Sequence, residues 1–151
     1  SVGQGRTRRA ESLVTARLQG TILVPGAAAG PVLALAEPLS FWGGVDPATG
    51  RIIEARHPDH GRLVAGHILA MPAVRGSSSS SSILAELLRA GLGPLGILLG
   101  ESDEILVVGA VVARELYGAD CPVVLLDPAD YAAAAVCASL TIEPDGTLSV
   151  D

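Results

Sequence analysis

Residues 64–88 read VAGHILAMPAVRGSSSSSSILAELL and describe the passage from a strand to a helix. The apolar run 64–71 is typical of a buried strand, whereas the apolar spacing of 83–90, followed by Gly91, is typical of a short helix. The six serines Ser77–Ser82 connect these two regular elements. We therefore interpret the serine tract as a strand-to-helix turn and not as a flexible linker.

This turn is the first candidate for chemistry. The first backbone N–H groups of a helix lack intrahelical partners, and they bind anions readily. Arg75 adds a fixed positive charge, because its guanidinium can form a bidentate fork with a carboxylate or a phosphate. Taken alone, these residues leave two interpretations open: they hold an anion, or they solvate a surface turn.

The elements on either side of the turn predict the architecture. Before it, β-rich segments occur at 18–24, 32–35 and 52–53. After it, we expect strands at 95–99 and 122–126, a helix at 102–117 with Ser102 as N-cap, a helical turn at 131–136, and a hairpin of 138–143 with 147–150. A β-rich first half followed by alternating strands and helices predicts an α/β domain. It would have a mixed sheet with a parallel core, helices, and an additional β-layer.

The composition fits one domain. The chain has 151 residues, of which 49% are hydrophobic, and this is enough to build a core. Residues 1–12 are polar and charged and lack an apolar period. We therefore expect a flexible N-terminal tail at 1–12 and a single domain at 13–151.

The charge balance argues against nucleic acid as the main partner. Sixteen acidic residues against ten basic ones leave a net charge of −6, which disfavours contact with a phosphate backbone. One Trp, one Phe and two Tyr offer no platform on which bases could stack. The apolar stretches are shorter than the roughly 20 residues that span a bilayer, so we expect no membrane insertion.

The chain contains two cysteines, Cys121 and Cys137. No secretory apolar region precedes them, so we expect a reducing, cytoplasmic location. An iron–sulfur cluster or a structural zinc ion needs about four protein ligands, and no such spacing is present. We therefore expect this chain alone to bind no metal or cofactor, and we interpret both cysteines as small buried hydrophobes.

Three motifs together point to a known family. They are SFWGGVDP at 40–47, GRII at 50–53 followed by RHP at 56–58, and RGSS at 75–78 followed by Ser81. On these motifs the chain resembles the small, swivelling subunit of the aconitase X family, over roughly residues 18–126. Val74 and Ser80 stand where this family often has glycine.

The resemblance implies a fold and a reaction. The family fold is a swivelling β/β/α domain that docks on a large subunit carrying an iron–sulfur cluster, with the active site between the two. Together they dehydrate a hydroxy acid, which is cis-3-hydroxy-L-proline for bacterial members and phosphomevalonate for archaeal members. An arginine-only, alanine-rich composition suggests a bacterial source, so we expect cis-3-hydroxy-L-proline as substrate, with phosphomevalonate as the alternative. We expect no activity without the large subunit.

The resemblance also implies roles for the serine tract. Ser77 is expected to be the proton acceptor and hence the catalytic residue. Arg75, Gly76, Ser78 and Ser81 are expected to bind the substrate. The remaining serines, Ser79, Ser80 and Ser82, are interpreted as filler or capping residues.

A second group of residues lies upstream and consists of Trp42, Gly43, Gly44 and Asp46. The Gly–Gly and Asp–Pro pairs predict a tight turn, in which Trp42 either plugs the core or lies at a subunit interface. His57 precedes Pro58 and is interpreted as a surface or interface residue. We predict that these five residues contribute to the interface or support the site, without direct chemistry.

Two other classes of function stay open at this point. The chain could be a stand-alone anion-binding or regulatory module, in which the loop holds a phosphate without turnover. It could also be a structural lid that only completes a partner's cleft. The lid interpretation predicts that Ser77→Ala leaves the activity of the assembled complex nearly intact.

Overall fold

Four parallel strands form the centre of the structure, a computed structural model that describes residues 17–150. They are β3 (Ala28–Ala34), β4 (Ile68–Met71), β5 (Gly96–Leu99) and β6 (Val123–Leu125). All residues of β4 and β5 are buried, which explains their continuous apolar sequence. Successive side chains of a strand point to opposite faces, so this sheet separates two hydrophobic cores.

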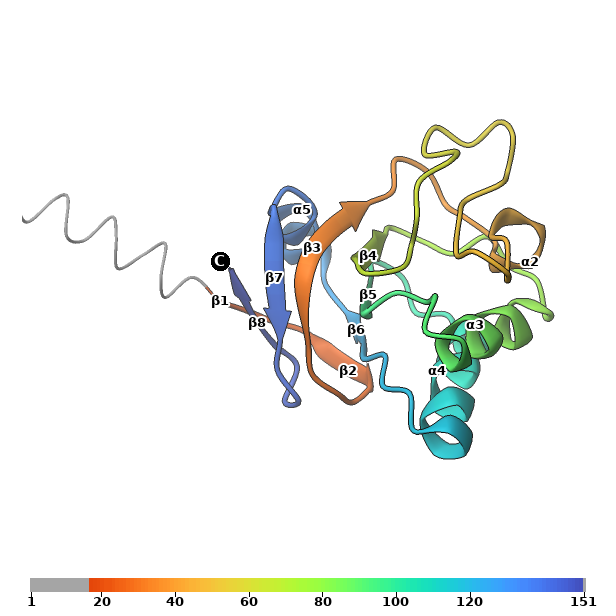
Figure 1. Cartoon of the computed structure of the whole chain (residues 1–151). Coiled ribbons are helices and arrows are strands. Elements are labelled where there is room, and N and C mark those ends of the chain that lie inside the picture. The colour runs from red at the N-terminus through yellow and green to blue at the C-terminus, as the bar shows by residue number, and fades with distance from the viewer. Residues whose placement is uncertain (1–16, 151) are drawn as a thin grey trace, which may run out of the picture.

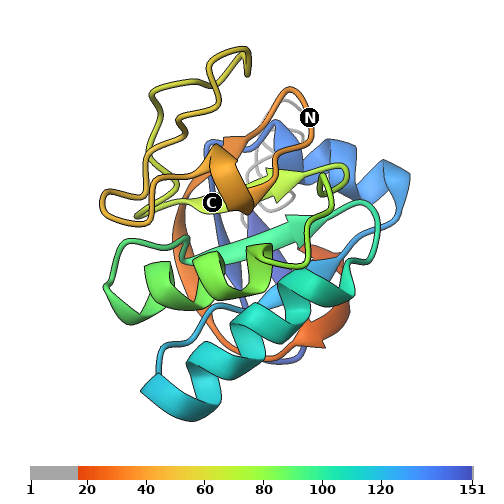
Figure 2. The same ribbon diagram turned by 90° about the vertical axis from the view of Figure 1, so that its right-hand side faces the viewer.

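The first core lies between the central sheet and two helices, α3 (Ser80–Arg89) and α4 (Glu104–Tyr117) (Figure 2). Leu69 and Met71 of β4 face this side, where Leu84 and Leu87 of α3 meet them in one buried cluster. The apolar positions of α3 recur at helical spacing, and burial of this stripe holds the helix against the sheet. The N-terminus of α3, with the serines that precede it, is thereby placed beside the loop that follows β4.

The second core lies on the other face of the central sheet, where an antiparallel β-layer covers it (Figure 1). This layer contains β7 (Ser139–Ile142), β8 (Thr147–Val150) and β1 (Arg17–Gln19), and α5 (Pro128–Ala135) packs against the same core. The other edge strand, β2 (Thr21–Val24), pairs with β6. Only Gly20 separates β1 from β2, so one continuous segment supplies both edges of the sheet, and the sheet folds back on itself.

The structure confirms the predicted class: a mixed sheet with a parallel core, the helices α3 and α4 on one face and a β-layer on the other, in the order β/β/α. The predicted hairpin and the end of α4 at Gly118 are also confirmed.

Several predicted boundaries are wrong, each for a local reason. The strand predicted at 64–71 begins at Ile68, because 64–67 form a turn, and the segment 18–24 is two strands. In the segment 52–53 there is no regular strand: Ile52 makes one isolated bridge, to Val45. The N-cap of α4 is Asp103 and not Ser102, since the Asp103 carboxylate accepts a hydrogen bond from the Leu106 N–H at 2.8 Å. Helix α3 begins three residues earlier than predicted, at Ser80.

The predicted flexible tail, residues 1–12, lies outside the described residues, so the tail and the domain boundary at residue 13 stay predictions. Within residues 17–150, no helix has both the length and the apolar character needed to cross a bilayer.

Candidate functional site

Loops that follow β3 and β4 meet at one end of the central sheet. Leu39 and Val74 form a parallel bridge beyond the regular strands, and the Arg75 N–H donates to the Leu39 carbonyl at 3.2 Å. Ligand-binding sites of parallel sheets generally lie outside the carboxyl ends of the strands, where the loops that follow the strands converge. Here they enclose a pocket of about 290 Å³, lined by Ser40, Trp42, Gly43, Gly44, Glu54 and Arg75.

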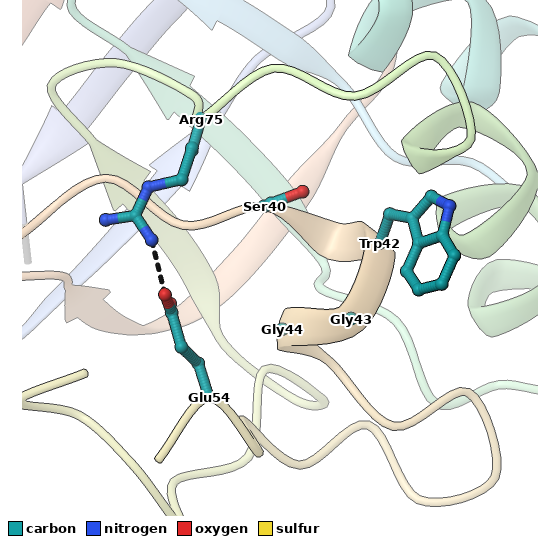
Figure 3. A pocket seen from close by; sticks show the side chains of 6 residues that line it. All are labelled: Ser40, Trp42, Gly43, Gly44, Glu54 and Arg75. Carbon is teal, nitrogen blue, oxygen red and sulfur yellow. Dashed lines mark hydrogen bonds and ion pairs between the residues drawn. The ribbon is translucent and has the colours of Figure 1, made fainter. Parts of the chain in front are cut away.

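An ion pair lies in this pocket. The Arg75 guanidinium donates through Nη1 to Oε1 of Glu54, and Figure 3 shows the two side chains pointing toward one another. The Arg75 side chain is 53% exposed and that of Glu54 is 28% exposed. The second carboxylate oxygen, Glu54 Oε2, is buried and has no hydrogen-bond partner among residues 17–150. Arg75 is therefore accessible from solvent, while Glu54 neutralises its charge.

The Trp-Gly-Gly loop is tied to the serine helix through one hydroxyl. Ser80 is only 1% exposed, and its Oγ accepts a hydrogen bond from the Trp42 N–H at 3.2 Å. The Ser40 and Ser80 hydroxyl oxygens lie 3.4 Å apart and share a further hydrogen bond. Ser80 was interpreted as filler or a cap, but it is a buried contact that links the two motifs.

Replacing Ser80 with alanine is expected to lower the free energy of unfolding by about 1–2 kcal/mol, because the Trp42 N–H and the Ser40 hydroxyl both lose a partner. Urea denaturation measures this change. Iodide quenching of Trp42, the single tryptophan of the chain, should also increase as its loop loosens. Ser82→Ala is the matched control, since Ser82 is exposed in the same tract. If both variants were equally stable, the proposed tie between the motifs would be refuted.

Trp42 itself does not fill the core. It is 56% exposed, whereas the preceding Phe41 is fully buried. The short helix α2 (Phe41–Gly44) is distorted at this point, and Gly43 has a φ of 76°, which a residue with a side chain rarely adopts. The interpretation of Trp42 as a core plug is wrong, because Phe41 occupies that place. Its position at an interface stays a prediction.

The serines expected to do the chemistry lie beside the pocket but do not line it. The Ser77 carbonyl accepts from the Ser80 N–H at 3.0 Å, and the Ser81 hydroxyl donates to the Ser78 carbonyl at 3.3 Å. Ser77 is partly exposed, and within residues 17–150 no hydrogen bond holds its hydroxyl. Ser77 is thus free to meet another group, and the roles of Ser77, Ser78, Ser81 and Gly76 stay predictions.

The remaining predicted residues, Asp46 and His57, make hydrogen bonds that hold the loops in place. Both Asp46 carboxylate oxygens accept hydrogen bonds, from the Ala48 N–H at 2.9 Å and the Thr49 hydroxyl at 3.1 Å. His57 is buried: Nδ1 accepts from the Asp59 N–H at 3.0 Å, so Nε2 carries the proton and donates to the Glu37 carbonyl at 3.0 Å. His57 therefore holds two loops together and is not at the surface.

The described residues do not fit an iron–sulfur cluster or another metal centre. No group of three or more His, Cys, Asp or Glu side chains that could hold a metal occurs in residues 17–150. The two cysteines belong to different cores, and burial raises the pKa of the Cys121 thiol to about 12, which disfavours the thiolate that a metal needs. A cluster on a partner chain stays a prediction.

Of the residues predicted for the site, the pocket brings together Arg75, Trp42, Gly43 and Gly44. Two lining residues, Ser40 and Glu54, were not predicted to have a role. Ser40 begins the motif at 40–47, but nothing in the sequence distinguishes its hydroxyl from those of the serine tract. A single Glu next to a β-rich pair carries no signal that it will face an arginine 21 positions later.

Comparisons with known proteins identify the family of this chain. The aconitase X swivel domain, as a family, matches residues 17–150. The chain is 49% identical over 104 residues to the cis-3-hydroxy-L-proline dehydratase of Pseudomonas aeruginosa, which covers 69% of this chain and 18% of that protein. The enzyme of the same name from Hypocrea jecorina is 45% identical over 113 residues, covering 75% of this chain and 19% of that protein. The chain thus spans about a fifth of the length of these relatives.

Other relatives are closer to this chain in length. The phosphomevalonate dehydratase small subunit of Methanothermobacter thermautotrophicus is 39% identical over 92 residues, covering 61% of this chain and 70% of that one. The crystal structure of Thermococcus kodakaraensis aconitase X in its holo-form superimposes with a TM-score of 0.77 at 29% identity, covering 89% of this chain and 98% of that chain. Because the family match spans all of residues 17–150, this chain belongs to the aconitase X swivel domain family.

Proposed function

We propose that this chain is the swivelling part of an aconitase X-type hydro-lyase, and that the complete enzyme removes water from cis-3-hydroxy-L-proline. The observation that carries the proposal is the placement of Arg75, a half-exposed guanidinium in a small pocket beside the serine tract. The higher identity to the two cis-3-hydroxy-L-proline dehydratases, 45% and 49%, favours this substrate over phosphomevalonate, for which the Methanothermobacter thermautotrophicus relative is 39% identical.

The residues of this chain have defined tasks in the proposal. Dehydration removes a proton from one carbon and a hydroxyl group from its neighbour, so the site needs a proton acceptor and a means to hold the substrate. Arg75 binds the substrate carboxylate, because a guanidinium matches a carboxylate in shape and charge. Ser77 is the proton acceptor. An iron–sulfur cluster, which the described residues do not fit, belongs to the partner chain in this proposal.

The assembly that follows is a heterodimer with a large subunit. Two cysteines outside any disulfide suit the reducing cytoplasm, which is also the compartment in which an iron–sulfur partner would be maintained. Phosphomevalonate dehydration is the alternative activity, and a structural lid is the alternative of another class.

Co-expression with the candidate large chain of the same genome tests the proposal. We expect a stable complex that, under anaerobic conditions, turns over cis-3-hydroxy-L-proline, and no turnover by either chain alone. Parallel assays with phosphomevalonate separate the two substrates. Arg75→Gln should reduce kcat/KM by about 10²-fold or more, since a charged hydrogen-bonded pair is lost. No complex and no turnover with either substrate would refute the proposed function.

A further inference from the structure

The pocket contains one positive and one negative group, which form an ion pair with each other. Arg75 and Glu54 make a single contact, between Nη1 and Oε1. The rest of the half-exposed guanidinium is open to solvent, and Oε2 of Glu54 has no donor within residues 17–150. Each group therefore has unused hydrogen-bonding capacity at the same pocket.

Binding of a ligand that carries only negative charge is unfavourable in this pocket. To bind Arg75 fully, it would have to displace Glu54 from the guanidinium. Glu54 would then keep no hydrogen-bond partner among the described residues, with one oxygen already buried. Separating this pair is unfavourable, because Glu54 keeps one buried carboxylate oxygen without a partner within residues 17–150 and loses the charge that compensates it. Glu54 thus opposes the binding of simple anions.

A zwitterion can bind without leaving Glu54 unpaired. Its carboxylate can take the place of Glu54 on the guanidinium, while its ammonium group donates to the carboxylate that has been released. One ion pair becomes two, the total charge of the pocket is unchanged, and both new contacts are charge-assisted hydrogen bonds.

We propose that the pocket selects small amino acid zwitterions, with Arg75 on the carboxylate and Glu54 on the ammonium group. This inference rests on the proposed function, because it names the substrate class of the same pocket. It makes Glu54 a specificity-determining residue. A volume of about 290 Å³ lies at the lower end of small-molecule pockets, which suits a single small amino acid.

An NMR titration of the isolated chain tests the inference with two ligands that differ in one group. L-proline carries a carboxylate and a ring ammonium, whereas tetrahydrofuran-2-carboxylate has the same ring size and carboxylate but an ether oxygen in place of the nitrogen. Trp42 lines the pocket and is the single tryptophan, so its indole N–H gives one resonance that reports on the site.

We expect L-proline to shift the Trp42 indole signal and to bind about tenfold or more tightly than the ether analogue, the factor that one charge-assisted hydrogen bond supplies. In Glu54→Gln this preference should fall to about one. Glu86→Gln is the matched control, since Glu86 pairs with Arg89 on the exposed side of α3 and its loss should leave the preference unchanged.

Three results would overturn the inference: no L-proline-dependent shift up to roughly 100 mM, equal affinity for both ligands, or an unchanged preference in Glu54→Gln. The comparison of the two ligands on the unsubstituted chain needs no variant and stands even if Glu54→Gln fails to fold. Since the titration needs neither partner nor turnover, its failure is distinguishable from failure of the co-expression assay.

Discussion

Ser77→Ala is expected to lower kcat of the assembled dehydratase by about 10²–10⁴-fold, the usual contribution of a group that transfers a proton in the transition state. Complex formation and the fold should be unaffected. Ser77 is partly exposed, its hydroxyl has no hydrogen bond within residues 17–150, and the contact it makes to Ser80 uses the backbone carbonyl, which alanine retains. Anaerobic single-substrate kinetics on the purified complex measure the change.

The reason that this effect requires the complex is energetic. A serine hydroxyl ionises far above neutral pH, and a helix N-terminus stabilises a nearby anion by at most ~2 kcal/mol. At about 1.36 kcal/mol for each pKa unit, the dipole of α3 lowers the pKa of a hydroxyl by less than about two units. The neighbouring Arg75 and the partner chain must supply the rest. The isolated chain should therefore show no turnover, with or without Ser77.

Ser82→Ala is the control for the Ser77 experiment, because it removes an exposed hydroxyl from the same tract. It should retain near-normal kcat. If Ser77→Ala also retained near-normal turnover, the chain would act as a lid and not as the source of the proton acceptor, and the catalytic role of Ser77 would be refuted.

Gly109→Val is expected to lower the free energy of unfolding by about 1–2 kcal/mol and to disturb the serine tract. Gly109 lies in α4 where that helix crosses the start of α3. A Cβ at this position would lie 2.7 Å from the Ser81 carbonyl oxygen and 3.0 Å from the Ser81 Cα. Both atoms belong to backbone, so α3 must shift. Overpacking of this kind costs about 1–3 kcal/mol and outweighs the gain of less than about 1 kcal/mol in helix propensity.

The measurement for Gly109→Val combines urea denaturation with kcat of the assembled enzyme. Because Ser81 is part of the predicted substrate-binding set, the shift of α3 should also lower kcat/KM at a temperature where the variant is folded. Val108→Ala changes the adjacent, half-exposed residue of the same helix and should alter stability by no more than about 0.5 kcal/mol. A Gly109→Val protein with normal stability would show that α3 and α4 are not in close contact.

Much of the fold was predictable because its signals are local. The buried strands β5 and β6 appear as short apolar runs, and α4 appears as an apolar period that Gly118 ends. Predicted element boundaries are wrong where side chains from distant parts of the sequence contact the element. Helix α3 begins at Ser80 and not at 83; in the structure the Ser80 hydroxyl is buried against Ser40 and Trp42, a contact that serine propensity does not reveal.

The candidate site was predictable only in part. Arg75 and the Trp-Gly-Gly loop carry recognisable motifs, and the structure brings them to one pocket. Glu54 and Ser40 carry no comparable signal. His57 is predicted as a surface or interface residue, yet it is buried within the chain, where both ring nitrogens find backbone partners, from Asp59 and from Glu37. The pairing with Glu37 joins residues 20 positions apart, and no periodicity encodes it.

By itself, the sequence determined the α/β class, the parallel core and the strand-to-helix turn with Arg75 and the serines, because periodicity, turn residues and charge act over a few neighbouring positions. Only the tertiary structure decided which charged side chains form ion pairs. Arg75 faces Glu54 across 21 positions, and one oxygen of that carboxylate is buried without a partner in the part of the chain that the structure describes. The physical reason is that burial and electrostatic pairing depend on distance in space, which is set once the two hydrophobic cores have brought the loops after β3 and β4 to the same end of the sheet.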